Sequence, residues 1–284
     1  MFSAGFDSFI FCVPKAQLIK FLKKHNLYER LRLTNRNEQV KAFIEQKYKN
    51  IDPKHKKYKM KIRYINILKR VKSLSNTILV FENTKETHAI ARKNKKSLDY
   101  YTLASFAGLH QPSKNVDKET LKILKAFLKR FSAYKIDIAW DFLGKEGLNK
   151  QSPTTLIHAS KEYIKNGGGL KNVRTTIYLN AFKEKYKISK LCWYDKYHKQ
   201  RFFHKEKIPD EMKKWQRLEL TFNLKKKFFK WFDTGGLMQS LLILDDIAIN
   251  LGLCDFLGVE KEVLNKQLIG FFDLRKVKSF KKIF

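Results

Sequence analysis

The sequence predicts an α+β fold, in which amphipathic helices cover one face of an antiparallel sheet. In the second half of the chain, several segments alternate between apolar and polar residues without a helix between most of them, so neighbouring strands must pair as antiparallel hairpins. Other segments carry apolar residues at helical spacing, which gives each helix one apolar stripe to bury. The second face of the sheet is then expected to carry basic and acidic side chains.

The first part of the chain begins with an apolar, aromatic strand over residues 6–13, which ends at Pro14. Residues 97–114 show a mixed pattern that indicates no element. The other elements expected here are helices over 15–31 and 37–49 and a hairpin formed by 77–81 and 87–92.

A strongly basic stretch, residues 54–72, contains nine Lys and Arg residues and no acid. Within it Lys57, Lys59, Lys61 and Arg63 alternate with apolar or aromatic residues, which predicts a strand with one basic face. Such a face is either solvated or a track for phosphate groups. The lack of acidic partners favours the phosphate track.

The middle of the chain contains the clearest helix and the clearest strand. Residues 118–131 carry an apolar stripe at helical spacing, and Asp117 is the expected N-cap. In residues 135–142 every even position is apolar, whereas Asp137 and Asp141 fall on the opposite face. A further helix is expected to begin at Pro153 and to end at the glycines of 167–169.

Three later strands place polar residues on what we expect to be the same face as the two aspartates. The polar positions are Arg174 and Tyr178 in 172–182, Tyr194 and Lys196 in 188–198, and Arg217 and Glu219 in 215–222. We therefore expect one catalytic or binding surface to collect side chains from four strands.

The expected organisation is one domain over residues 1–232 followed by a helical C-terminal extension over 233–284, with Gly235 and Gly236 near the boundary. The domain itself is compatible with two sheet halves, at about 1–115 and 116–232. The last helices are expected over 237–251 and 260–272.

The charge of the chain identifies its expected partner. Sixty Lys and Arg residues against 27 acidic residues give a formal net charge of +33. So basic a chain repels itself unless it binds an anion, and nucleic acid is the commonest such partner. An acidic membrane surface is the second option, but no membrane anchor is evident. Three unpaired cysteines and the lack of a signal peptide predict a cytoplasmic protein.

The predicted polar face suits chemistry at a phosphodiester. A tyrosine hydroxyl such as that of Tyr194 becomes nucleophilic when a cation, metal or base lowers its pKa, and Lys196 could supply the cation. Glu219, together with Asp137 or Asp141, could bind Mg²⁺ or Mn²⁺. The two aspartates are four strand residues apart, roughly 13 Å, so only one of them can share an ion with Glu219.

A plainer interpretation is available for each of these residues. Tyrosine is common in strands, and this chain has 12 of them. The acidic residues could simply pair with neighbouring cations. Composition and alternation alone favour a non-catalytic nucleic-acid-binding domain over an enzyme. No pair of histidines flanks a hydrophobic residue, so the two-histidine metal motif of many rolling-circle nickases is absent from the sequence.

Four short motifs in order nevertheless resemble the replication initiation factor family, which contains rolling-circle plasmid Rep proteins, filamentous phage initiators and related relaxases. The matching segments are 136–142, 175–178, 193–196 and 215–220, and the likeness is good over about 134–222. The residues after Tyr178 and after Lys196 depart from the family pattern, and no acid follows Lys196 at the usual place.

The resemblance implies a nickase in which Tyr194 attacks single-stranded origin DNA, forming a 5′-phosphotyrosine and a 3′-OH primer. Glu219 and the aspartates match acidic positions, and Lys196 and Arg217 match basic ones. A homodimer and a helicase partner are further implications. The alternatives are a non-catalytic DNA- or RNA-binding protein, or a metal-dependent nuclease without a covalent intermediate.

Overall fold

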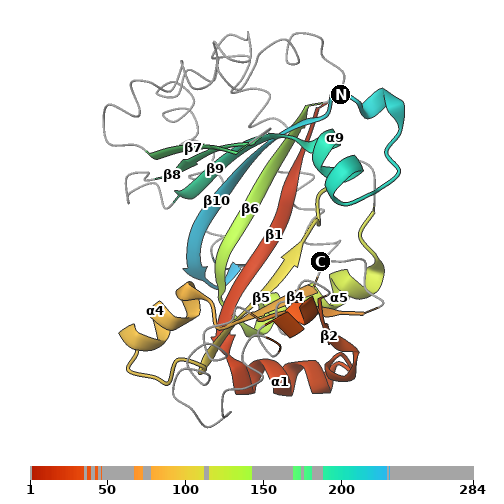
Figure 1. The fold of residues 1–284 in the computed structure, drawn as a ribbon. Coiled ribbons are helices and arrows are strands. Elements are labelled where there is room, and N and C mark those ends of the chain that lie inside the picture. Colours follow the sequence, from red (N-terminus) through yellow and green to blue (C-terminus); the bar gives the residue numbers. More distant parts are fainter. Residues whose placement is uncertain are drawn as a thin grey trace. The chain divides into compact units, whose positions relative to one another are not determined.

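The computed structural model describes residues 2–34, 37–39, 42–43, 46, 67–72, 78–111, 115–142, 169–173, 176–180, 188–228 and 230 (Figure 1). The predicted basic strand at Lys57, Lys59, Lys61 and Arg63, Arg174, which was expected to bind DNA, and the C-terminal extension lie outside these residues. Within them, no helix is both long and apolar enough to span a membrane.

The chain forms two compact units. The first unit comprises residues 8–109 and 116–134, and the second comprises 1–7, 110–115 and 135–284. Strands β1 (Phe2–Pro14) and β6 (Ala133–Phe142) contribute residues to both. Neither unit is one continuous stretch of sequence, since residues 116–134 belong with residues 8–109.

The first unit contains an antiparallel run of strands in the order β2-β3-β4-β5-β1. The bounds are β2 (Leu31–Leu33), β3 (Ile67–Val71), β4 (Ile78–Glu82) and β5 (Tyr101–Ala107). Strand β5 lies in the stretch to which the sequence assigned no element, and it pairs on one side with β4 and on the other with β1.

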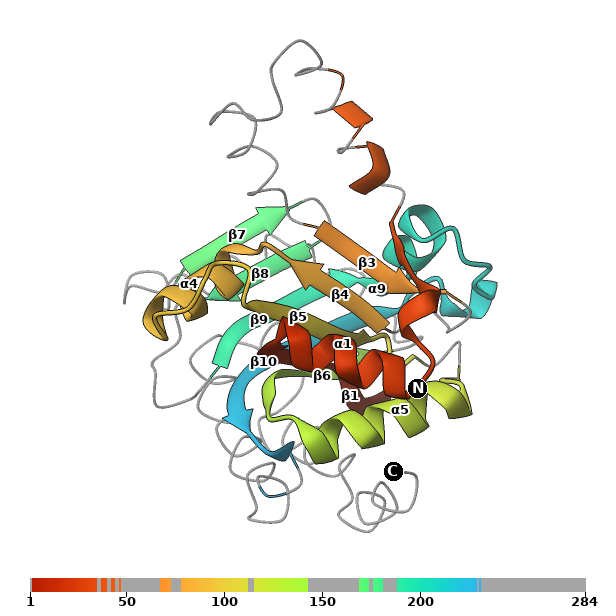
Figure 2. The same ribbon diagram turned by 90° about the horizontal axis from the view of Figure 1, so that it is seen from below.

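Two amphipathic helices cover one face of this run, as predicted (Figure 2). Helices α1 (Lys15–Lys24) and α5 (Lys118–Arg130) meet at Phe21 and Phe127, whose ring centroids are 4.6 Å apart. Phe127 also packs against Phe11 of β1 at 4.8 Å. Asp117 caps α5 as expected, since its carboxylate accepts a hydrogen bond of 2.7 Å from the Thr120 amide.

The predicted hairpin between 77–81 and 87–92 is wrong in its second arm. Residues 85–93 form helix α4 (Lys85–Lys93), because the Thr84 hydroxyl caps it by accepting from the Thr87 amide at 3.0 Å. Strand β4 takes β3 and β5 as its partners instead. Likewise α1 is shorter than predicted, and a turn of 3₁₀ helix, η1 (Tyr28–Arg30), leads into β2.

The second unit contains the strand order β6-β10-β9-β8-β7. The bounds are β7 (Gly169–Val173), β8 (Thr176–Asn180), β9 (Ile188–Asp195) and β10 (Gln216–Lys226). The alternation predicted for β6 and β10 is confirmed on their apolar side, where Ile136, Trp140, Leu218 and Leu220 are buried. The pairing of these strands also decides which polar side chains lie next to one another on the opposite face.

Between β9 and β10 the chain makes a compact helical excursion. It consists of α9 (Lys196–His198), a π-helix η3 (Lys199–Phe203) and a 3₁₀ turn η4 (Asp210–Met212). Tyr197, Ile208 and Trp215 form a small apolar core beneath it. The amides of Lys196 and Tyr197 both donate to the Trp215 carbonyl, which ties the start of the excursion to the start of β10.

Candidate active site

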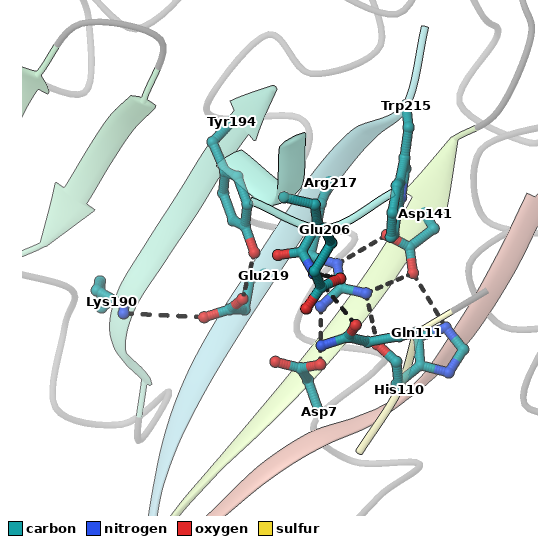
Figure 3. A network of polar contacts seen from close by, with 11 residues as sticks. Asp7, His110, Gln111, Asp141, Lys190, Tyr194, Glu206, Trp215, Arg217 and Glu219 are labelled. Atoms are coloured by element: carbon teal, nitrogen blue, oxygen red, sulfur yellow. Dashed lines mark hydrogen bonds and ion pairs between the residues drawn. The ribbon is translucent and has the colours of Figure 1, made fainter. Parts of the chain in front are cut away.

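The register of β9 and β10 brings the predicted catalytic residues together. Arg217 is paired with Tyr194, and Glu219 with Cys192, so these side chains project from one face of the sheet. The Tyr194 hydroxyl donates a hydrogen bond to Glu219 Oε2 at 3.1 Å, across a diagonal of the ladder (Figure 3). The prediction that Tyr194 and Glu219 share a face is confirmed.

This polar face is buried, whereas the sequence predicted an open face for DNA. Tyr194 is 2% exposed and Arg217 is fully buried. The α9–η3 excursion supplies part of the cover, because Lys199 Nζ lies 4.5 Å from the centroid of the Tyr194 ring. A polar face can be buried in this way because its charged groups are paired with one another.

Burial controls the acidity of the tyrosine and its partner. It raises the pKa of Tyr194 well above the usual value, and the neighbouring Glu219 carboxylate raises it further. The pKa of Glu219 is also raised, first by burial and then by the carboxylates of Asp7 and Asp137. Lys190 Nζ, 3.9 Å from Glu219 Oε1, opposes this rise. Tyr194 is therefore protonated in this state, with a proton acceptor in place.

Arg217 is the centre of a buried network rather than an open phosphate-binding cation. Its guanidinium donates to Asp141 through Nε at 2.7 Å and through a terminal nitrogen at 2.8 Å, and to Asp7 at 2.7 Å. A fourth hydrogen bond goes to the His110 carbonyl oxygen. The side chain thus already has carboxylate or carbonyl partners on several sides.

Asp141 is held by three donors. Besides Arg217, it accepts from Trp215 Nε1 at 2.6 Å and lies 3.2 Å from His110 Nε2. Burial acts to raise the pKa of Asp141, but the Arg217 guanidinium outweighs burial and holds the pKa below its usual value. The same opposition holds the pKa of Asp7 low.

The two predicted acidic positions of β6 divide their roles. Asp141 lies against Arg217, whereas Asp137 Oδ1 accepts a hydrogen bond of 2.6 Å from the Thr221 hydroxyl, two residues along β10 from Glu219. Asp137 is close enough to Glu219 and Lys190 to shift both of their pKa values. The aspartate that lies beside Glu219 is therefore Asp137.

Lys196 is not on the strand face that the sequence predicted. It is the first residue of α9, because Asp195 ends β9 and caps this turn by accepting from the His198 amide. Its side chain is 4% exposed, and its Nζ lies 5.9 Å from the centroid of the Tyr194 ring. Burial and then the Arg217 charge lower the pKa of Lys196 to about 8.

Tyr178, the remaining residue that was expected to bind DNA, lies on β8 beside Cys192, and therefore on the same face as Tyr194. It is only half-buried, and burial raises its pKa. It adds an aromatic ring and a hydroxyl group at the side of the site remote from β6.

The acidic residues fit a divalent ion only if DNA completes the coordination. Among the described residues, no group of three or more His, Cys, Asp or Glu side chains is placed to hold a metal ion. Mg²⁺, however, is commonly held by one or two carboxylates, water and substrate phosphate. Glu219 and Asp137 match that donor set. A bound cation would lower the pKa of Glu219 and so oppose the rise that burial and the neighbouring carboxylates cause.

Sequence reasoning missed Asp7, His110, Gln111, Gln200 and Glu206. Asp7 is an acid within an otherwise apolar strand, which was the one available signal. His110 and Gln111 lie in the stretch that showed no pattern. Glu206 is brought back by η3, where its carboxylate accepts from the Gln200 amide at 2.7 Å. Only the fold shows that these residues meet the site.

Comparison with known proteins gives one kind of match. No protein-family model matches the sequence, and no curated protein matches it. The structure is similar to that of a rolling circle replication initiator protein from Geobacillus stearothermophilus, at 11% sequence identity and a TM-score of 0.38. The match covers 88% of this chain and 85% of that one. The assignment of residues rests on the site itself.

Proposed function

We propose that the protein initiates rolling-circle replication by nicking single-stranded origin DNA through Tyr194. The observation that carries this proposal is the 3.1 Å hydrogen bond from the Tyr194 hydroxyl to Glu219. A tyrosine with a raised pKa needs a base at the moment of attack, and Glu219 has a raised pKa and lies in contact with its proton.

The reaction follows from these contacts. Glu219 accepts the hydroxyl proton while Tyr194 Oη attacks the phosphorus. The bond from phosphorus to the 3′ oxygen breaks, and that oxygen leaves as a 3′-hydroxyl after taking a proton from water. The 5′ phosphate remains on the tyrosine. Lys196, the buried cation near the ring, offsets the negative charge of the phosphate.

A divalent ion held by Glu219 and Asp137 would polarise the phosphate. Asp141 and Arg217 act on the reaction indirectly, because they fix β6 and β10 side by side and so fix the spacing of Asp137 and Glu219. DNA must also displace Lys199 from the tyrosine ring, since Tyr194 is 2% exposed in this state. The phosphate itself is a suitable new partner for that lysine.

The burial of Tyr194 favours a second candidate function, a nucleic-acid-binding protein without nicking activity. In that case the Tyr194 hydroxyl would serve only as a hydrogen-bond donor to the buried Glu219 carboxylate. The two functions differ in whether a covalent product forms.

The test incubates the protein with Mn²⁺ and either supercoiled or single-stranded origin DNA, and separates covalent protein–DNA product on a denaturing gel. Wild type is expected to give that product, and Tyr194→Phe to reduce it by about 1,000-fold or more. Cleavage by Tyr194→Phe at the wild-type rate would exclude this nucleophile and favour a metal-dependent nuclease. Salt-sensitive binding without any nick by wild type would establish the second function.

Glu219→Ala separates a chemical role from a structural one. It is expected to abolish cleavage while DNA affinity stays close to that of wild type. Cys192→Ala is a matched control, because Cys192 is buried beside Glu219 in the register but takes no part in the proposed chemistry. Equal loss of binding and cleavage in Glu219→Ala would contradict its role as the base.

A further inference from the structure

The excursion between β9 and β10 exposes a pair of neighbouring aromatic rings. Phe202 is 62% exposed, and its ring lies 4.8 Å from that of the exposed His198, with 39° between the two planes. The other large hydrophobic side chains that the structure describes as exposed, Tyr28, Phe43 and Tyr100, all belong to the first unit. Leaving a phenylalanine largely in water forfeits most of its burial energy.

The pair stands on an unusual piece of backbone. The His204 amide donates to the Lys199 carbonyl at 3.1 Å, which closes the π-helical turn, and Lys205 follows with a left-handed φ of 56°. Turns of this kind are rare and are frequently found at functional sites. Gln200, which lies between His198 and Phe202 in sequence, is 2% exposed, and its side-chain amide donates hydrogen bonds to Glu206 and Gln111. These hydrogen bonds anchor the turn that carries both rings.

The charges around the pair indicate what the ligand is. Lys199, Lys205 and Lys207 are exposed on the same short segment, while Asp195 is engaged in capping α9. The ligand should therefore combine a flat aromatic surface with negative charge. Unpaired nucleotides have this chemistry, whereas the bases of a duplex are already stacked on one another.

The pair lies on the same short segment as a residue that contacts the proposed nucleophile. Lys199, three residues before Phe202, is the residue whose ammonium group lies 4.5 Å from the Tyr194 ring centroid. On the basis of the proposed function, we propose that His198 and Phe202 form a stacking platform for an unpaired base that flanks the phosphate attacked by Tyr194. The platform would hold the strand while Lys199 moves onto its phosphate backbone.

Binding is tested in the Tyr194→Phe background, so that no cleavage occurs. Fluorescence anisotropy compares a short oligothymidylate with an abasic strand of the same length and charge, for Phe202 and for its Ala and Trp variants. Loss of one base–aromatic stack is expected to weaken oligothymidylate binding by roughly 5- to 150-fold in Phe202→Ala. Binding of the abasic strand should change little, and Phe202→Trp should retain the preference, with tryptophan fluorescence quenched by the base.

Phe43→Ala is the matched control, because Phe43 is 63% exposed but lies in the first unit. The proposal is overturned if Phe202→Ala binds oligothymidylate as tightly as Phe202 does, or if it weakens both strands equally. It is also overturned if Phe202→Ala changes only self-association in sedimentation, which would assign the ring to a second copy of the chain. If base-dependent binding is lost but wild type never forms covalent product, the platform stands and the proposed nicking function falls.

Discussion

Arg217 and Asp141 form a two-point ion pair that is wholly enclosed in the protein. Both side chains are fully buried, and two hydrogen bonds of 2.7 and 2.8 Å join the guanidinium to the two carboxylate oxygens. Because Arg217 is on β10 and Asp141 is on β6, the pair fixes how these strands lie beside each other. The position of Glu219 relative to Asp137 depends on the same strands.

Replacement of Arg217 by Ala is expected to destabilise the protein by about 3–5 kcal/mol, because it leaves two buried carboxylates without their cation. The free energy of unfolding is measured by urea titration. Lys213→Ala is the control, since its ion pair with Asp210 is exposed and should be worth less than about 1 kcal/mol. A double change, Arg217→Met with Asp141→Leu, should cost less than the sum of the single changes. Strict additivity would show that the two residues are not coupled.

Gly5→Ala tests how His110 is positioned. A Cβ atom at residue 5 would come within 2.5 Å of His110 Nδ1 and 2.9 Å of Cγ, which is closer than real contacts allow. The imidazole must then move and loosen its 3.2 Å contact with Asp141. We expect a loss of stability of about 1–3 kcal/mol. Combining it with His110→Ala should restore most of that loss, and an undiminished loss would place the strain elsewhere.

Lys196 gives the nicking reaction an expected pH dependence. Its pKa of about 8 means that the ammonium charge is present below pH 8 and is lost above it. Initial rates of covalent product formation should therefore fall about tenfold per pH unit above pH 8. Loss of folding caused by Lys196 cannot explain a falling rate above pH 8. The unfolded lysine has the higher pKa, so titration of this residue makes the folded state more stable as the pH rises from about 8 towards that pKa.

Lys196→Arg is the matched variant for the pH profile, because an arginine keeps its charge throughout this range. Its rate should stay flat above pH 8, even if the bulkier side chain lowers the rate overall. Melting temperatures at each pH provide the folding control. A profile that still falls in Lys196→Arg would assign the titration to another group.

The two aspartates of β6 should respond differently to amide substitution. Asp137→Asn should raise the concentration of Mn²⁺ or Mg²⁺ needed for half-maximal cleavage by about tenfold or more, with little change in stability. Asp141→Asn should instead lower stability, because it removes the charge that faces Arg217. Titration of metal in the nicking assay, beside urea unfolding, separates the two effects. A metal requirement that moves only in Asp141→Asn would reverse the assignment.

Local pattern was informative wherever one face of an element meets the core. The alternation of 135–142 predicted both the strand and its apolar face, since successive side chains of a strand point in opposite directions. Asp117 predicted the start of α5 because capping involves only the next few residues. The second arm of the predicted hairpin failed because β-branched and apolar residues also fit a short helix with a good cap at Thr84.

The sequence by itself determined the basic charge, the antiparallel strands with their two faces, and the sharing of one face by Tyr194 and Glu219. These features depend on composition and on the two-residue period of a strand. Only the tertiary structure decided that the face is buried, that Asp141 belongs to Arg217 and Asp137 to the neighbourhood of Glu219, and that Lys196 begins a helix. It also brought in Asp7 and His110. Such pairings join residues far apart in the chain, and strand register and long-range packing fix them rather than any local pattern.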